Sequence, residues 1–397
     1  MSRLRGTAAA AALAVLCAAY AWAFLRAESQ QALALLVLAG VAAGATVTRT
    51  RLVDRLPPVP ERAAESLALV AVAGLCLALR EDDFSLLLVA RVLIVVLACL
   101  GLHIQLGYAG ILNFAGASFF GVGGYTAAVL TRSTGLPHLL VLVAGGAMAV
   151  LIGTLIVVPV LRTRGHYAAL ITIAFALLFR TFLEVNDSLG GPQGLKLREI
   201  RIGPWRFNDP VELGPFSGSF YLNYLALLLV LLALFWSVVQ RLERSWIGID
   251  LDAVRLDETA AATFGIEVAR SKILAFTLGN FLAGVAGAVS AHMVGFIAPN
   301  NYSFGESLVL VSILLLGGVG NPWGVALASA IVVILPEKLQ VLQEYRFLLY
   351  AGMVVLILIF RPVGLLPRRM RRLAAADRSA PRFSRRDDRV FDSRSSP

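Results

Sequence analysis

Residues 86–104, LLLVARVLIVVLACLGLHI, form an apolar run long enough to cross a bilayer, interrupted by the charge of Arg91 alone. A backbone inside lipid must satisfy its own hydrogen bonds, so such a run is predicted to be helical. Comparable runs recur along the 397 residues, of which 58% are hydrophobic and only 15% are charged. This composition excludes an ordinary soluble domain and predicts an all-α fold, a polytopic bundle of transmembrane helices.

The apolar runs predict about 10 to 12 membrane-crossing segments. Residues 306–335 contain LGGVGNPWG, in which glycines and a proline gather at the centre of the run. Because Pro and clustered Gly interrupt helices, we expect two short or half-membrane helices that meet at this turn. The predicted spans are 7–25, 32–48, 64–80, 86–104, 110–131, 139–161, 167–186, 220–240, 273–296, the pair within 306–335, and 347–361.

Basic residues are unevenly divided between the two sides of this predicted topology. With the amino terminus inside, most Lys and Arg fall on the inner side, above all in residues 241–272 and in an Arg-rich tail, 368–397. Cytoplasmic loops carry such an excess, so both termini are predicted to be cytoplasmic. The tail has a Ser/Pro/Arg composition typical of disorder, and anionic lipid explains its charge better than nucleic acid does.

These features divide the chain into three parts. We predict a two-helix extension (1–62), a membrane core (63–367) and the basic tail. Residues 1–25 also resemble a signal peptide, but their apolar run is longer than a usual signal core, so a retained anchor is favoured.

The residue patterns that carry chemistry in other protein classes are missing from the sequence. Cys17, Cys76 and Cys99 lie in three different apolar spans, which is neither a disulfide framework nor a zinc-binding spacing. Neither the phosphate-binding pattern Gly-x-x-x-x-Gly-Lys-Ser/Thr nor the pattern His-Glu-x-x-His occurs. We therefore expect a protein that is not an enzyme, with no catalytic residue, no metal site and no cofactor of its own.

Residues 251–263 form a polar, helix-forming stretch between two spans. Asp250 is suited to cap its start, and Gly265 to end it in a left-handed conformation. One face of the predicted helix is apolar, mostly small, and carries the carboxylate of Glu258, whereas helices that lie on lipid have larger apolar residues. A docking surface for another protein is therefore favoured over a solvated loop helix with an internal Arg255–Glu258 ion pair.

The segment RLDETAAATFGIEVARSKILAF (255–276) resembles the cytoplasmic loop of ABC-importer permeases of the branched-chain amino acid and urea type. In that family a Glu-x-Ala-Ala-x-x-x-Gly helix docks in a groove of the ATP-binding subunit, and Thr259 departs from the smaller or aliphatic residue common there. In the outer-loop motif GGPQGL (190–195), Pro192 and Gln193 stand where the family usually has a small hydroxyl residue followed by Asn or Asp. Further resembling stretches follow in the family's order: LGYAGILNFAGASFFGVGGYTAAVL (106–130), LRTRGHYAALITIAFALLFR (161–180), GGPQGL (190–195), LGGVGNPWGVALASAIVVILPE (316–337) and FRPVGLLP (360–367).

This resemblance implies the longer permease subunit of an importer in a bacterial cytoplasmic membrane. The implied partners are ATP-binding cassette subunits, which hold ATP and Mg, a sister permease in a heterodimer, and an extracytoplasmic solute-binding protein. The binding protein is expected to contact Gly190, Gly191 and Gly194 in the outer loop. The ATPase is expected to contact Arg255, Glu258, Ala260, Ala261 and Gly265.

A path for zwitterionic or amide solutes needs hydrogen-bonding groups with few fixed charges. Amide and hydroxyl side chains within the spans are candidates, although packing explains each of them as well. Glycines are expected to permit interrupted helices and close backbone packing. The path candidates are Asn113, Tyr125, Thr172 and Asn280, and the glycines are Gly121, Gly123, Gly124, Gly317, Gly318 and Gly320.

Two other classes compete with an ATP-driven permease. A secondary transporter or channel that works without ATP needs carboxylates or His inside its spans, and the core shows no clear case. A membrane enzyme needs clustered polar residues at one interface. Arg91 and Arg180 lie towards the ends of their spans, where snorkelling, or an Arg180–Glu184 pair, explains them. Branched-chain amino acids, urea and short amides remain open as the solute.

Overall fold

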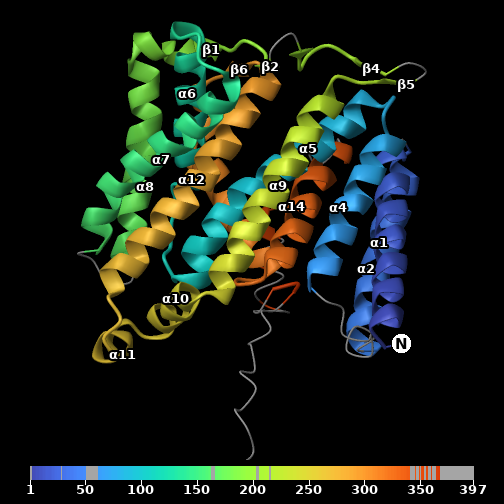
Figure 1. The fold of residues 1–397 in the computed structure, drawn as a ribbon, viewed down its shortest axis with the longest axis horizontal. Helices are drawn as coiled ribbons and strands as arrows, with labels where there is room; N and C mark the ends of the chain where they lie inside the picture. Colours follow the sequence, from blue (N-terminus) through green and yellow to red (C-terminus); the bar gives the residue numbers. More distant parts are fainter. Residues whose placement is uncertain are drawn as a thin grey trace, which may run out of the picture. The chain divides into compact units, whose positions relative to one another are not determined.

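The described part of this computed structural model is built almost entirely of helices (Figure 1). Within it, five helical stretches are long and apolar enough to cross a membrane, which confirms the predicted helical membrane fold. They are Asp83–Tyr108, His138–Pro159, Tyr167–Val185, Tyr221–Arg244 and Val268–Val294. The structure describes residues 2–27, 29–50, 61–161, 166–202, 205–213, 216–339, 345, 348, 350–352, 355, 359 and 364–366.

The helices follow the predicted spans closely. In chain order they are α1 (Ser2–Arg26), α2 (Gln30–Thr50), α4 (Glu61–Ala78), α5 (Asp83–Leu102), α6 (Gly116–Ser133), α7 (His138–Leu161), α8 (His166–Val185), α9 (Tyr221–Arg244), α10 (Trp246–Leu256), α11 (Glu258–Thr263), α12 (Val268–Val294), α13 (Phe304–Gly317) and α14 (Pro322–Lys338). The predicted span 347–361 lies largely, and the tail 368–397 entirely, outside the described residues. The division into extension, core and tail therefore stays a prediction.

Short elements join these helices. They are the π-helix η1 (His103–Tyr108), the 3-10 helices η2 (Asp187–Leu189), η3 (Gly191–Gln193) and η4 (Pro299–Tyr302), and the strands β1 (Leu195–Lys196), β2 (Arg201–Ile202), β3 (Trp205–Arg206), β4 (Val211–Leu213), β5 (Phe216–Gly218) and β6 (Phe296–Ile297). β2 pairs with β3, and β4 with β5, as local hairpins. β1 pairs with β6, which follows α12, so this pairing ties the loop after α8 to the end of α12.

α12 is the central helix of the bundle and packs against α5, α6 and α7. Glycines set how closely these helices approach. A Cβ added to Gly123 would lie 1.9 Å from the carbonyl oxygen of Gly284, and one added to Gly287 would lie 1.8 Å from that of Phe120. Because lipid provides no hydrophobic drive between helices, such close van der Waals packing is what holds them together.

The predicted interruption at Gly121, Gly123 and Gly124 is wrong. All three residues lie inside α6, which runs unbroken from Gly116 to Ser133. Their missing side chains make room for neighbours instead: a Cβ at Gly121 or Gly124 would lie within 3 Å of the Tyr302 ring or hydroxyl. A glycine in lipid keeps its helical hydrogen bonds, so it breaks a helix only where the packing requires a turn.

The helices are interrupted at two other places. After α5 the chain continues as the π-helix η1, and residues 109–115 are not helical, so the predicted span 110–131 starts too early. The second interruption is the predicted Gly-rich turn between α13 and α14, where Gly318 and Gly320 have φ values of 106° and 95°. Only glycine adopts such angles readily, so the position of this reversal is set by the sequence.

The two ends of the bundle carry different structures (Figure 1). The strands lie at one end, and α10 and α11 lie at the other. α12 joins them, because it begins just after α11 and ends just before β6; its 27 residues span about 40 Å at about 1.5 Å per residue. We call these the strand end and the α11 end.

We expect Gly123→Ala to destabilise the protein by about 1–3 kcal/mol or more, because the new methyl group must displace the α12 backbone at Gly284. Thermal denaturation in mild detergent, followed by size-exclusion chromatography, measures the effect. Gly74→Ala is the matched control, since a Cβ at this helical glycine meets nothing within 4 Å. Equal melting temperatures for the two variants would contradict the close approach of α6 and α12.

Candidate functional site

The polar stretch at the α11 end folds as two helices. Ser245 caps α10 through the amide of Gly248, and Asp257 caps α11 through the amides of Thr259 and Ala260, at 2.8 and 3.0 Å. The predicted cap at Asp250 is wrong, because Ser245 already satisfies the first amides of α10 and Asp250 lies within that helix. Asp257 is extended, with φ at −159°, so it ends α10 and starts α11.

The predicted end of the stretch is confirmed. Gly265 has a φ of 82°, in the left-handed region that glycine favours. Glu258 pairs with Lys272 of α12 at 2.6 Å, and Arg255 pairs with Asp252 at 3.7 Å, so the internal Arg255–Glu258 pair is not formed. Glu258 therefore connects α11 to α12.

α11 presents most of its surface to solvent. Glu258 and Ala260 are exposed, whereas Ala261 is only 3% exposed and packs inside the chain, so its predicted contact with an ATPase is corrected. Arg255 is partly buried, and its side chain lies against Gly110. Leu256 and Phe264, at the two ends of α11, are 72% and 86% exposed. Both are large apolar side chains that the described part of the chain leaves uncovered on either side of α11.

The three glycines of the outer loop hold its backbone in shape. Gly190, Gly191 and Gly194 all have positive φ values. A Cβ on Gly190 would lie 2.1 Å from the carbonyl oxygen of Gly194, and one on Gly194 would lie 2.0 Å from that of Ile297. Gly191 is buried, while Pro192 and Gln193 between them are exposed. The glycines thus present Pro192 and Gln193 at the surface, and a contact with a binding protein stays a prediction.

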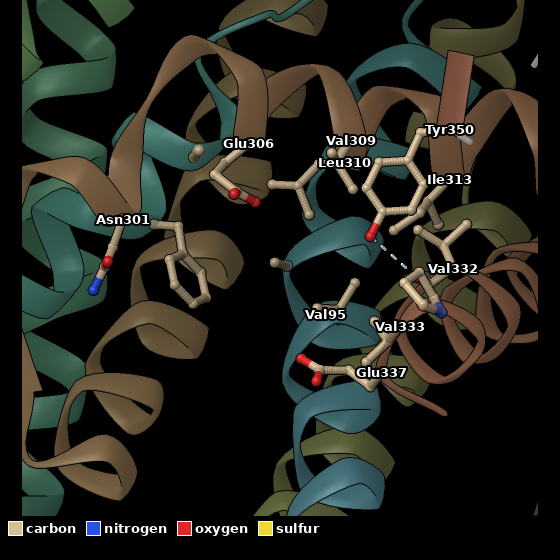
Figure 2. A pocket seen from close by; sticks show the side chains of 14 residues that line it. Val95, Asn301, Glu306, Val309, Leu310, Ile313, Val332, Val333, Glu337 and Tyr350 are labelled. Carbon is tan, nitrogen blue, oxygen red and sulfur yellow. Dashed lines mark hydrogen bonds between the residues drawn. The ribbon is translucent and has the colours of Figure 1, made fainter. Parts of the chain in front are cut away.

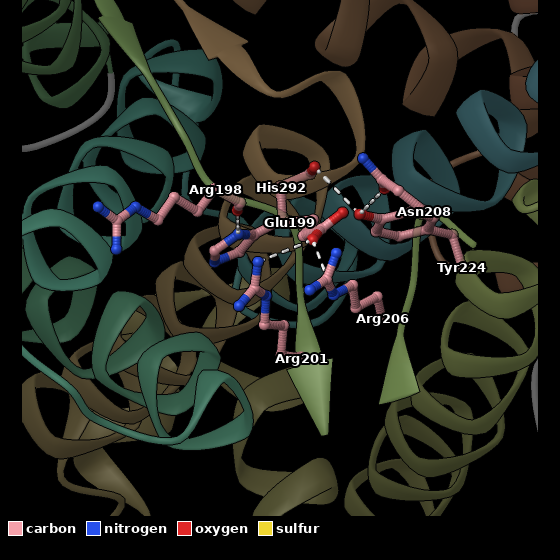
Figure 3. A network of polar contacts seen from close by, with 7 residues as sticks. All are labelled: Arg198, Glu199, Arg201, Arg206, Asn208, Tyr224 and His292. Carbon is pink, nitrogen blue, oxygen red and sulfur yellow. Dashed lines mark hydrogen bonds and ion pairs between the residues drawn. The ribbon is translucent and has the colours of Figure 1, made fainter. Parts of the chain in front are cut away.

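Two sets of polar contacts at the strand end fasten this loop (Figure 3). Glu199 accepts a hydrogen bond from Arg201 at 3.2 Å and lies 4.0 Å from Arg206, which stabilises the β2–β3 hairpin. The ring of His292, at the end of α12, lies 3.0 Å from the carbonyl oxygen of Arg198 through its Nδ1 atom. These residues were not predicted, because nothing in their spacing along the sequence links them.

Tyr224 of α9 completes the second set. Its hydroxyl lies 3.1 Å from Asn208 Oδ1 and 3.2 Å from the backbone oxygen of His292 (Figure 3). Tyr224 is fully buried. The loop is therefore attached to both α9 and α12, so a displacement of the loop acts on the ends of two spans.

Three of the four predicted path residues lie together beside the non-helical segment 109–115. Asn113 donates to Gln105 Oε1 at 2.7 Å, and Gln105 donates to Asn280 Oδ1 at 2.8 Å. Thr172 accepts from the amide of Phe114 at 3.1 Å. Tyr125 lies apart and packs against Tyr302, with 5.8 Å between ring centroids.

Gln105 is the centre of this cluster. The side chains of Asn113, Gln105 and Asn280 are buried, and Gln105 bonds to both asparagines, while no hydrogen-bond partner is found for the Asn280 amide nitrogen among the described residues. The role of these residues in a path stays a prediction. Gln105 was missed, although its only signal was visible: it is an uncharged amide in an otherwise apolar run.

A cavity of about 200 Å³ lies among α5, α6, α13 and α14 (Figure 2). Most of its wall is aliphatic, and Glu306 and Glu337 lie at the edge of the aliphatic group. Arg91 donates to Glu337 at 2.7 Å. It lies near the middle of α5 (Asp83–Leu102), so this ion pair, and not a position at the end of the helix, explains its charge. The predicted Arg180–Glu184 pair is confirmed at 2.8 Å, and Arg180 also donates to Asn300. We call this space the α13–α14 cavity.

Residues 85–360 match the family model described as branched-chain amino acid transport system / permease component. The chain belongs to this permease family. It is 35% identical to the high-affinity branched-chain amino acid transport system permease protein LivM of Escherichia coli (strain K12), over 69% of this chain and 68% of the relative. It is 23% identical to a probable LivM of Methanocaldococcus jannaschii, over 68% and 89%.

More distant similarity extends to other import permeases. The permease is 31% identical to the autoinducer 2 import system permease protein LsrC of Klebsiella pneumoniae, over 46% of this chain and 54% of the relative. It is 22% identical to LivH of Salmonella typhimurium, over 68% and 91%. No solved structure matches the chain.

Gln105→Ala is expected to destabilise the permease by about 1–3 kcal/mol, because it leaves the buried amides of Asn113 and Asn280 without their partner. Thermal denaturation in detergent measures the loss. Gln240→Ala on α9 removes an amide that accepts a long, exposed bond from Arg244 at 3.4 Å, so a change within about 0.5 kcal/mol is expected there. A stability loss no larger than that of the control would refute the network.

Proposed function

We propose that this permease is one of two membrane subunits of an ATP-driven importer for branched-chain amino acids. The family match and the names of the relatives support the solute class. The permease contributes the path, and ATP and Mg are held by separate ATP-binding cassette subunits. The second membrane subunit is a sister permease of the same family, in a heterodimer.

The contact with the ATPase rests on α11. Glu258 on α11 and Lys272 on α12 lie 2.6 Å apart, and the Lys272 side chain is only 12% exposed, so α11 is held against the central helix. Displacement of α11 therefore acts directly on α12, which packs against α5, α6 and α7. This connection from an exposed helix to the centre of the bundle is the observation that carries the proposal.

The exposed ends of α11 supply the affinity for such a partner. Phe264 and Leu256 are mostly exposed in this chain, and aromatic and aliphatic anchors of this kind dominate binding energy when a partner buries them. Glu258 and Ala260 lie between these anchors, and Gly265 lets the chain turn away after Phe264. Together these residues present two apolar side chains and one carboxylate to a groove on the partner protein.

The excess of basic residues supports an orientation in the membrane. Residues 241–272 are on the basic side, so the α11 end faces the cytoplasm, with both termini, and the strand end faces outward. The membrane is the cytoplasmic membrane of a bacterium. A solute-binding protein docks at the strand end on the exposed Pro192–Gln193 turn, which Gly190, Gly191 and Gly194 hold in place.

Transport then requires two conformations of the permease, in which the solute path is open to opposite sides of the membrane. Closure of the ATPase subunits shifts α11, and the interrupted segments, η1 with residues 109–115 and the turn between α13 and α14, absorb the change. A ligand at either end shifts this equilibrium only through its different affinity for the two conformations. The interruptions supply the two-state elements that such coupling requires.

Reconstitution with its ATPase, sister permease and binding protein tests the function. Liposomes that hold the complex are expected to accumulate L-leucine only with ATP and only with the binding protein present. Uptake without ATP by this chain alone would refute the proposal and favour a secondary transporter.

Glu258→Ala is expected to lower ATP-driven uptake by about fivefold or more, with membrane insertion unchanged. A factor of about five corresponds to the weakest coupling energies usual between two sites of a protein. Glu267→Ala is the matched control, because Glu267, just before α12, is a similarly exposed carboxylate that pairs locally with Arg270 and does not connect two helices. Lys272→Met separates two roles for Glu258. If it reproduces the Glu258→Ala loss, the carboxylate acts through α12; unchanged uptake in Glu258→Ala would rule out any role in coupling.

A further inference from the structure

A histidine at the end of α12 holds the middle of the outer loop, and the proposed function gives it no role. The ring of His292 lies 3.0 Å from the carbonyl oxygen of Arg198 through its Nδ1 atom (Figure 3). We propose that His292 is a proton-sensitive latch: its neutral ring holds the loop, and a proton taken up from the solution at the strand end releases it. This regulation by pH goes beyond the proposed function.

The contacts of His292 show which nitrogen would receive the proton. A carbonyl oxygen only accepts hydrogen bonds, so Nδ1 must carry the hydrogen and Nε2 the lone pair. Nε2 is buried and has no hydrogen-bond partner among the described residues, and His292 as a whole is only 1% exposed. A proton on Nε2 would therefore add a buried N–H group and a charge without an acceptor, which costs free energy.

The groups that face this ring do not offer a negative charge to balance the proton. The ring of His138, at the start of α7, stands edge-on to it, with 5.5 Å between ring centroids. Glu199 and Arg201 of the loop act on His138, and Glu199 already accepts from Arg201 at 3.2 Å. Tyr224 of α9 contacts the backbone oxygen of His292 at 3.2 Å. The carboxylate nearest to the pair is thus engaged within the loop.

The loop around the latch is basic as well. Residues 196–206 hold one carboxylate, Glu199, and the cations Lys196, Arg198, Arg201 and Arg206. The side chain of Arg198 points away from His292 in Figure 3, and Arg132, near the end of α6, is exposed. A charged imidazole would add a further positive charge beside these cations, and release of the loop relieves that repulsion.

The latch lies between two attached stretches of the loop. Before it, the amide of Leu197 donates to the carbonyl oxygen of Gly295 at 2.9 Å, beside the β1–β6 pair. After it, Asn223 of α9 donates to the carbonyl oxygen of Phe207 at 3.1 Å. The described residues between these attachments, 198–202 and 205–206, include the β2–β3 hairpin. They are the part of the loop that the latch would release.

The direction of the pH effect follows from which form of the loop can bind the proton. In the attached loop the ring is neutral, whereas in the released loop it is hydrated and titrates at the ordinary pKa of histidine, about 6.5. Proton uptake by the released form alone shifts the equilibrium towards release by about tenfold between pH 7.5 and pH 5.5. In the proposed importer, in which this end faces outward, an acidic exterior would therefore loosen the loop.

Hydrogen exchange of the full chain in lipid nanodiscs, at pH 7.5 and pH 5.5, tests the latch. After correction for the intrinsic pH dependence of amide exchange, the amides of residues 198–202 are expected to lose about tenfold in protection at pH 5.5. Those in the centre of α12 should stay protected at both pH values. In His292→Asn the new Nδ2 atom takes the place of the ring Nδ1 and gains no proton, so the tenfold difference should disappear.

His166→Asn is the matched control, because His166 begins α8 at the end of the bundle opposite the strand end, and its response should equal that of the wild type. Should His292→Asn fail to fold, His292→Gln replaces it. Equal protection of the wild type at the two pH values, or an undiminished response in the His292 variant, would overturn the inference and leave His292 as a packing contact. The measurement needs neither ATP nor a partner, so its failure is distinct from an absence of ATP-driven leucine uptake.

Discussion

Lipid offers no hydrogen-bond partner to a peptide group, so each interruption of a membrane helix needs protein groups that replace the missing bonds. The chain meets this constraint at residues 109–115. The amide of Phe114 donates to Thr172 of α8, that of Ala115 to Asn113, and that of Ala117 to Ser307 of α13. Because two of these acceptors lie far away in the sequence, the start of α6 is fixed only when α8 and α13 are in place. The interruption is thus a product of the assembled bundle.

The lipid environment also explains why glycines lie at the closest contacts of the central helix α12. Between helices in lipid, packing must come from close approach and not from the exclusion of water. Gly101 and Gly279 show the result, since a Cβ on Gly101 would lie 2.3 Å from the Gly279 carbonyl oxygen. Helices that touch along their backbones have little freedom to slide past one another.

Much of the fold was predictable, because span length and hydropathy are properties of single segments. The reversal at Gly318 and Gly320 also followed from local composition, and both glycines have positive φ. The cap at Ser245 was missed because Ser245 and Asp250 are both acceptable caps in isolation, and only the surrounding fold selects between them. For the candidate site, Asn113 and Asn280 were identified, but their shared partner Gln105 lies 175 residues before Asn280 and cannot be paired from spacing.

The pairing of β1 with β6 has a further consequence, because it joins the outer loop to the end of the helix that begins after α11. A protein bound at the strand end and a protein bound at α11 would thus both act on α12, from its two opposite ends. Thermodynamic linkage then requires symmetry: whatever the first partner adds to the affinity of the second, the second adds to that of the first. Through the 27 residues of α12, binding of a partner on one side of the membrane would change the affinity for a partner on the other side.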